Sequence, residues 1–284
     1  MRSHFVKWGI SFVAVFCCAY LLLAAQTSGQ QPGRAQAGAA AAKPAAATAW
    51  KVPKTPWGEP DFSGMWEPKM PASAREFSGY SFVSHKDVVP LMTAWGKDQY
   101  EQTKPSWGPR AVADSTDMVN PTTGKEVGCE PTGVPRIWVH PFPTKIVQAP
   151  GAVYLLHEFN HETREIYTNK GKQHDKDVDP LWMGNPVAWW EGDTLVIDSV
   201  GFNGKTWIDR AGLPSSEQLH VIERLSRPTP NRLHVDITVD DPKTYTKPVV
   251  GSRDLMLEPG WPITEMICED NITFNDLKNQ GREQ

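Results

Sequence analysis

From residue 145 onward, hydrophobic and polar residues alternate in short runs separated by turn signals. In the clearest run, 233–239, large aliphatic residues occupy every odd position and polar residues every even one, as expected for a strand with one buried face. The runs 187–190 and 194–200 flank Glu-Gly-Asp at 191–193, which predicts a β-hairpin. Further β segments are expected at 144–148, 219–227, 249–257 and 263–268.

Tight turns join these β segments, and no long crossover helices separate them. Parallel strands need such crossovers, so antiparallel pairing is expected. One helix is predicted within residues 85–103, with Asp87 as its cap and Pro90 in its first turn. The proline-rich residues 104–144 predict a long irregular covering segment. The expected fold is therefore mainly β, an antiparallel meander closed into a barrel or sandwich, with one or two short helices.

The N-terminal segment has the pattern of a secretory signal peptide. Arg2 and Lys7 come before an apolar run at 8–25, which ends in small residues. A retained membrane anchor is the alternative, because a run of about 18 residues is just long enough to span a bilayer. We expect cleavage and a periplasmic or secreted protein without stable membrane insertion. The expected organisation is signal peptide 1–25, Ala/Pro-rich linker 26–55, single β domain 56–275 and C-terminal tail 276–284.

Composition and charge exclude several classes of protein. The chain has 284 residues, of which 39% are hydrophobic and 22% charged, with a formal net charge of −4. These values are those of a folded soluble protein and exclude a polytopic membrane protein and a disordered chain. The near-neutral charge also argues against an electrostatic nucleic-acid partner.

Four cysteines are present, and Cys17 and Cys18 would leave with the signal peptide. In an exported protein, the remaining Cys129 and Cys268 are expected to form one disulfide. It would close a loop of about 140 residues and contribute roughly 4–5 kcal/mol in the chain-entropy model. Two buried free thiols are the alternative.

Several short motifs carry a family resemblance. Residues 61–66 (Asp-Phe-Ser-Gly-Met-Trp) contain a Gly-x-Trp motif that looks like the opening of lipocalin-like barrels. Over residues 55–272 the chain resembles a group of exported bacterial β-proteins of unassigned activity. The resemblance implies export and a lipocalin-like β architecture, and it implies no catalytic residues. The motifs that carry it are Trp-Met-Gly at 182–184, Trp-Glu-Gly-Asp-Thr-Leu-Val-Ile-Asp at 190–198, Gly-Phe-Asn at 201–203, His-Val-Ile-Glu-Arg at 220–224 and Cys-Glu at 268–269.

One pentapeptide fits a metalloprotease motif. His157, Glu158 and His161 match H-E-x-x-H, which on a helix would place two imidazoles to bind zinc beside a glutamate base. Pro-Gly at 150–151 and Lys-Gly at 170–171 bracket the segment, however, and its residues favour strands. We therefore expect a strand and hairpin here, a fortuitous motif, and no bound metal.

The loop after residue 200 offers a second set of candidate residues. Glycines allow it to turn tightly over the open end of the barrel, close to the strand that carries His220 and Arg224. An Asp–His pair there could act as a general base. Surface ion pairs of little energetic value are the alternative. The candidate catalytic residues are His161, Asp209 and His220, and the candidate ligand-binding residues are Arg164, Trp182, Asn203, Trp207 and Arg224.

The leading functional hypothesis is binding of a small, partly apolar ligand in the mouth of the barrel, without a cofactor. The second is a cofactor-independent acid/base enzyme (hydrolase, lyase or isomerase) that uses His161 or His220 with Asp209. A third is a zinc hydrolase that uses His157 and His161. A fourth is a glycan or envelope interaction module that uses exposed tryptophans.

Overall fold

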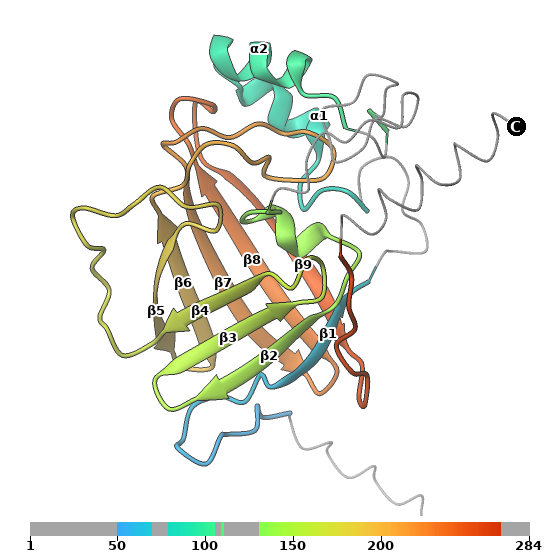
Figure 1. Ribbon diagram of the computed structural model, residues 1–284, viewed down its shortest axis with the longest axis vertical. Coiled ribbons are helices and arrows are strands. Elements are labelled where there is room, and N and C mark those ends of the chain that lie inside the picture. The colour runs from blue at the N-terminus through green and yellow to red at the C-terminus, as the bar shows by residue number, and fades with distance from the viewer. Residues whose placement is uncertain (1–49, 70–78, 106–108, 111–130, 268–284) are drawn as a thin grey trace, which may run out of the picture. The chain divides into compact units, whose positions relative to one another are not determined.

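In the part of the chain that the computed structural model describes (residues 50–69, 79–105, 109–110 and 131–267), nine strands form one sheet. The strand order is β4-β3-β2-β1-β9-β8-β7-β6-β5, and every neighbouring pair is antiparallel (Figure 1). The sheet curls until it nearly closes into a barrel, which confirms the predicted fold class. The strands are β1 Gly64–Pro68, β2 Thr144–Ala149, β3 Ala152–His157, β4 Thr163–Tyr167, β5 Asn185–Glu191, β6 Thr194–Val200, β7 His220–Thr229, β8 Arg232–Asp240 and β9 Val249–Leu257.

Local sequence signals account for the hairpins. Glu191 pairs with Thr194 at the end of the β5–β6 hairpin, and Gly192 adopts the positive φ of 62° that its turn requires. The predicted β7–β8 hairpin also forms, with Thr229 opposite Arg232. On β8 the residues at positions 233, 235, 237 and 239 are fully buried, as the alternation predicts.

Trp189 and Trp190 point to opposite faces of β5, as the strand period requires. The Trp190 ring packs edge-on against Phe62 at 5.3 Å between centroids and contacts the core. Trp189 lies on the outer face, where its indole N–H donates to Glu191 at 2.7 Å.

The expected single helix is interrupted. It is divided into α1 (His85–Val88), the 3₁₀ turn η1 (Val89–Leu91) and α2 (Ala94–Gln102). Pro90 lies in η1, and Met92 is extended (ψ 141°) and bridges to Tyr245. Thr93 then caps α2 by accepting the Gly96 N–H at 3.0 Å. The predicted cap, Asp87, instead lies inside α1, whose N-cap is Ser84.

The two ends of the barrel differ. Short hairpins close one end, whereas the described segments 79–105 and 131–143, the connections 201–219 and 241–248, and the β3–β4 turn lie at the other, which we call the capped end. There a second 3₁₀ turn, η2 (Arg136–Val139), buries Ile137, Trp138 and Val139 against the core. Contacts with the barrel begin before the expected domain start, because the Trp50 indole donates to the Arg227 carbonyl at 3.1 Å.

Candidate functional site

A row of polar side chains lies on the inner face of the sheet at the capped end. Thr144 on β2 is directly opposite His157 on β3, and its hydroxyl lies 2.7 Å from His157 Nδ1. Glu162, which precedes β4, accepts the His157 backbone N–H at its carbonyl (2.8 Å), so these two residues are also cross-strand neighbours. All three are buried.

A buried ion pair lies next to this row, inside the barrel. Arg164 on β4 makes two parallel hydrogen bonds to Glu223 on β7, at 2.7 and 2.8 Å. The Trp138 indole N–H donates to the same carboxylate, and Ser199 on β6 lies 3.4 Å from the guanidinium. Arg164, a predicted ligand-binding residue, thus engages Glu223 and helps to form the floor of the site.

Residues before β2 cover the row. The backbone N–H of Thr132 donates to Glu162 Oε1 at 2.6 Å. The His140 ring lies 4.5 Å from the Phe159 ring, and Phe142 lies 5.3 Å from the same ring. These rings form an apolar wall beside the polar groups.

The buried polar atoms without a hydrogen-bond partner include four in this row and its cover: Thr132 Oγ1, His140 Nδ1, His157 Nε2 and Glu162 Oε2. We call these four residues the mouth cluster. Each buried unpartnered group costs about 1–3 kcal/mol, so native proteins retain few without a reason such as catalysis or ligand contact.

The same burial shifts the acid–base equilibria. It raises the pKa of Glu162 to about 7, against the opposing effects of Thr132 and the charge of Arg136. The Thr132 hydroxyl is close enough to contribute to this opposing effect, although it is outside hydrogen-bond geometry. Burial, helped by the charge of Arg164, lowers the pKa of His157 to about 3. Burial and the charge of Arg136 also lower the pKa of His140, so both imidazoles are neutral near pH 7.

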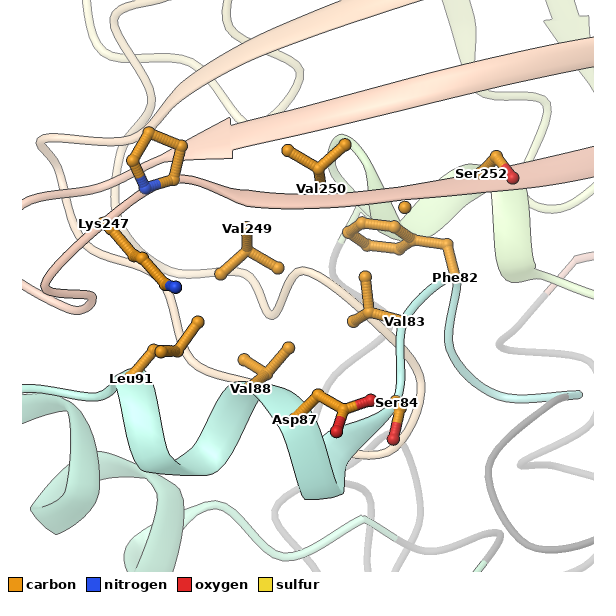
Figure 2. Close-up of a pocket in the computed structure, with 12 residues that line it drawn as sticks. Phe82, Val83, Ser84, Asp87, Val88, Leu91, Lys247, Val249, Val250 and Ser252 are labelled. Carbon is orange, nitrogen blue, oxygen red and sulfur yellow. The ribbon is translucent and has the colours of Figure 1, made fainter.

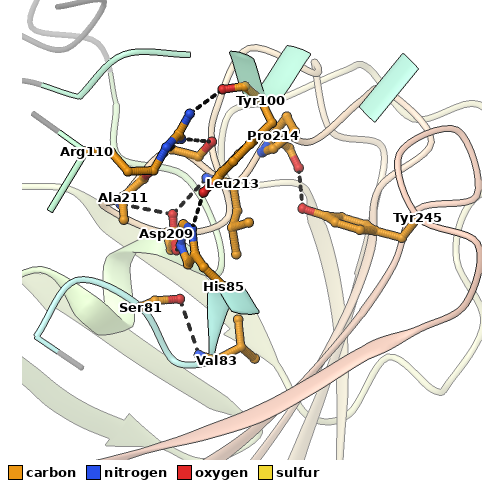
Figure 3. A network of polar contacts seen from close by, with 11 residues as sticks. Ser81, Val83, His85, Tyr100, Arg110, Asp209, Ala211, Leu213, Pro214 and Tyr245 are labelled. Atoms are coloured by element: carbon orange, nitrogen blue, oxygen red, sulfur yellow. Dashed lines mark hydrogen bonds and ion pairs between the residues drawn. The ribbon is translucent and has the colours of Figure 1, made fainter. Parts of the chain in front are cut away.

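Asp209 is completely buried and pairs with a histidine that the sequence analysis did not select (Figure 3). Its Oδ2 lies 2.5 Å from His85 Nε2, and its Oδ1 accepts the backbone N–H groups of Ala211 and Leu213. His85 Nδ1 in turn lies 2.9 Å from the Tyr100 hydroxyl. Asp209 was expected to act with His161 or His220, and neither is among these partners. The network connects α1, α2 and the 201–219 loop, which indicates a structural role.

The H-E-x-x-H residues lie on a strand end and a turn, as expected from the turn signals, and not on a helix. His157 ends β3 and is buried, whereas His161 lies exposed in the β3–β4 turn with a φ of 51°. Glu158 accepts the Thr264 backbone N–H at 3.0 Å. Among the described residues, no group of three or more His, Cys, Asp and Glu side chains is placed to hold a metal ion.

His220 and Arg224 share a face of β7, but it is the outer face of the barrel and not its mouth. His220 Nε2 lies 2.8 Å from Asp198, and Arg224 pairs with Glu191 at 2.8 Å. The intervening Glu223 points inward to Arg164. The strand period predicts this alternation, but which face is inner depends on how the sheet closes.

The 203–210 loop lies at the capped end, and two of its residues approach the site: Trp207, and Arg210, whose charge helps to lower the pKa of His140. The Arg136 guanidinium lies 4.8 Å from the centre of the Trp207 ring. Asn203 instead shapes the loop by accepting the Lys205 N–H at 3.0 Å, and the Lys205 ammonium lies 5.6 Å from the Trp182 ring. Of the predicted residues, Arg164, Trp207 and His157, the last considered only as a zinc ligand, thus lie at the site. Thr132, His140 and Glu162 were missed, although the cross-strand position of His157 and Glu162 could have been read from the hairpin.

Comparison with protein-family models, curated proteins and solved structures finds no significant match. In the described part of the chain, no helix is both long and apolar enough to cross a membrane. Cys129 and Cys268 lie outside the described residues.

Proposed function

We propose that this is an exported small-molecule-binding protein that takes up a small organic acid in the mouth cluster. The observation that carries the proposal is the convergence of four buried, unpartnered polar atoms at the capped end of the barrel. Thr132 and His157 both contact Glu162 through backbone hydrogen bonds, and His140 is close enough to His157 for the charge of one to lower the pKa of the other. A single ligand can therefore meet several of these groups at once.

The groups favour an anionic acceptor. The Thr132 hydroxyl can donate, and so can a protonated Glu162 at Oε2, since its Oε1 already accepts a hydrogen bond. When the Thr144 hydroxyl donates to Nδ1, the neutral His157 ring carries its hydrogen on Nε2. Arg136 lowers the pKa of Glu162 and thereby contributes positive potential at the site. Phe142 and Phe159 provide an apolar surface for an aryl or alkyl group, so a carboxylate such as benzoate fits these features.

Binding should be linked to uptake of one proton. A carboxylate ligand next to an ionised Glu162 would be repelled, whereas a protonated Glu162 can donate to it. Among the described residues, Arg136 acts on Glu162 through its charge and His157 contacts it through the backbone. The charge of Arg164 lowers the pKa of His157, and the charges of Arg136 and Arg210 lower that of His140, so both histidines are neutral in this range. Because the pKa of Glu162 is about 7, the fraction of the protein with a protonated Glu162, which can bind the ligand, falls about tenfold between pH 6 and pH 8.

The test is calorimetric titration of the protein with benzoate at pH 6 and pH 8. We expect about tenfold tighter binding at pH 6. Glu162→Gln, whose amide donates at every pH, should bind benzoate with an affinity that changes little between the two conditions.

The matched control is Glu165→Gln, which changes an exposed carboxylate on the outer face of β4 and should behave as the wild type. Equal wild-type affinities at both pH values, or binding unaffected by both Glu162→Gln and His157→Leu, would refute the proposal.

An acid/base enzyme is the second candidate, and the pKa of Glu162 favours it. A carboxyl that titrates near pH 7 beside a neutral imidazole is suited to proton transfer under physiological conditions. A panel of small esters and of carboxylic acids with an acidic α-proton would test it. Turnover that is lost in Glu162→Gln and retained in Glu165→Gln would favour this function over simple binding.

The exported location rests on the basic and apolar pattern of residues 1–25 and on the family resemblance. Intact-mass measurement of the protein recovered from the periplasm or medium tests it. A mature chain that begins near Gln26 is expected, whereas full-length protein retained in the membrane would support the anchor alternative.

A further inference from the structure

A pocket lies on the outside of the barrel, between the α1–η1 segment and the start of β9 (Figure 2). Its volume is about 480 Å³, which is within the usual range for small-molecule sites. Its lining is mixed: the apolar side chains of Phe82, Val83, Val88, Leu91, Val249 and Val250 stand among polar ones from Ser84, Asp87, Lys247 and Ser252. It is separate from the mouth cluster, none of whose residues line it.

The backbone holds the two sides of the pocket together. A Cβ on Gly251 would lie 2.3 Å from the Phe82 carbonyl oxygen, so only glycine allows the chain before α1 to lie this close to β9. Val88 and Val249 are anchored in the core, at 4% and 2% exposed. Val250, in contrast, is 66% exposed, an unusual value for a large aliphatic residue on a strand. The pocket therefore presents apolar surface on a fixed frame.

One positive charge, on the exposed Lys247, lies beside the apolar part of this pocket. The Lys247 ammonium group points between Leu91 and Val249 (Figure 2). It has no ion-pair partner among the residues that the structure describes. The Asp87 carboxylate turns toward Ser84 at the opposite side of the pocket. A cation beside an elongated apolar surface is complementary to a ligand with an anionic head and a hydrocarbon chain.

We propose that this pocket is a second ligand site, which binds a single-chain anionic amphiphile such as a medium-chain fatty acid. The carboxylate pairs with Lys247, and the chain lies along Leu91, Val88 and Val250 toward Phe82. This site goes beyond the proposed function, because it shares no residue with the mouth cluster and requires no proton uptake.

The test is calorimetric titration with sodium laurate below its micelle concentration. We expect one site per chain, with decanoate binding roughly tenfold more weakly because two fewer methylenes are buried. Lys247→Gln should weaken laurate about tenfold and remove its advantage over dodecanol, and Lys247→Arg should retain that advantage. Val250→Asp, which adds a negative charge at an exposed position, should abolish laurate binding and leave benzoate binding unchanged.

The matched control is Val147→Asp, which introduces the same change at a valine 38% exposed on β2, and it should bind laurate as the wild type does. Three results would overturn the proposal: equal affinity in wild type, Lys247→Gln and Val250→Asp; more than one laurate per chain with no dependence on Lys247; or binding to anionic vesicles without binding to monomeric laurate.

Discussion

At the scale of single residues, burial acts in opposite directions on the two cross-strand neighbours Glu162 and His157. Each loses solvation of its charged form, so the carboxyl pKa rises to about 7 and the imidazole pKa falls to about 3. Both groups are therefore held mainly neutral at slightly acidic pH. Near pH 7 the carboxyl titrates and the imidazole does not.

This difference predicts how Glu162→Gln affects stability. A carboxyl with a raised pKa binds protons more tightly in the folded state, so its contribution is complete below about pH 4.5 and is lost as pH rises through about 7. Glu162→Gln should thus be more stable than the wild type at pH 8, by on the order of 2–3 kcal/mol, and about equal to it at pH 4.5. Urea unfolding across this pH range measures the difference.

His157 gives the opposite pH dependence of stability, because its lowered pKa makes the folded protein less stable as pH falls below 6.5. Because His157 is present in both proteins, the difference between wild type and Glu162→Gln isolates the carboxyl. A difference that does not change between pH 4.5 and pH 8 would contradict the assigned environment of Glu162.

At the scale of elements, the ion pair of Arg164 and Glu223 links strands that are distant in the sheet. β4 is one edge of the described sheet, and β7 lies two strands from the other edge. The pair and Ser199 connect β4 with β6 and β7 across the interior of the barrel. These contacts help to hold the two edges of the sheet near each other.

Breaking this pair should be strongly destabilising. We expect Glu223→Leu to cost about 3–5 kcal/mol, because it leaves the Arg164 guanidinium buried without its carboxylate. The double change Arg164→Met with Glu223→Leu should recover much of that loss. Denaturant unfolding provides the measurement. The exposed pair of Arg224 on β7 and Glu191 on β5 is the control, and Arg224→Gln should change stability little. Equal effects of Glu223→Leu and Arg224→Gln would contradict this account.

At the scale of the whole molecule, the β3–β4 turn contacts two described residues, Thr132 and Met266, that are close in sequence to the two cysteines. Thr132 donates its N–H to Glu162, and Met266 accepts the Asn160 N–H at 2.7 Å. Cys129 is three residues before Thr132, and Cys268 is two residues after Met266. At about 3.3–3.6 Å per residue, both cysteines can reach the same region.

We therefore maintain the prediction of a Cys129–Cys268 disulfide in the exported protein. Oxidation removes one hydrogen from each thiol, with an oxidised thiol–disulfide exchange partner as acceptor. Non-reducing peptide mapping should recover the two cysteines in one cross-linked peptide. The Cys129→Ser/Cys268→Ser variant should lose about 4–5 kcal/mol of stability in the chain-entropy model. Two thiols that alkylate freely in the native, unreduced protein would contradict the prediction.

The sequence by itself determined the class of the fold and the positions of its hairpins. The alternation at 233–239 and the Glu-Gly-Asp turn at 191–193 are local features, because strand period and turn geometry depend on neighbouring residues. The single helix expected within 85–103 was wrong for a non-local reason. Its middle is held extended by Tyr245, about 150 residues away.

Only the tertiary structure decided which polar residues act together. Asp209 and His85 are 124 positions apart, and Glu223 and Arg164 are 59 apart. Alternation along β7 indicated that Glu223 and Arg224 face opposite ways, but closure of the sheet determined that Glu223 is inside. Burial and charge pairing depend on which residues the closed barrel brings together. Burial and pairing in turn determine the pKa values and which polar atoms are left without a partner. The mouth cluster and the pocket beside β9 therefore became visible only once the chain was folded.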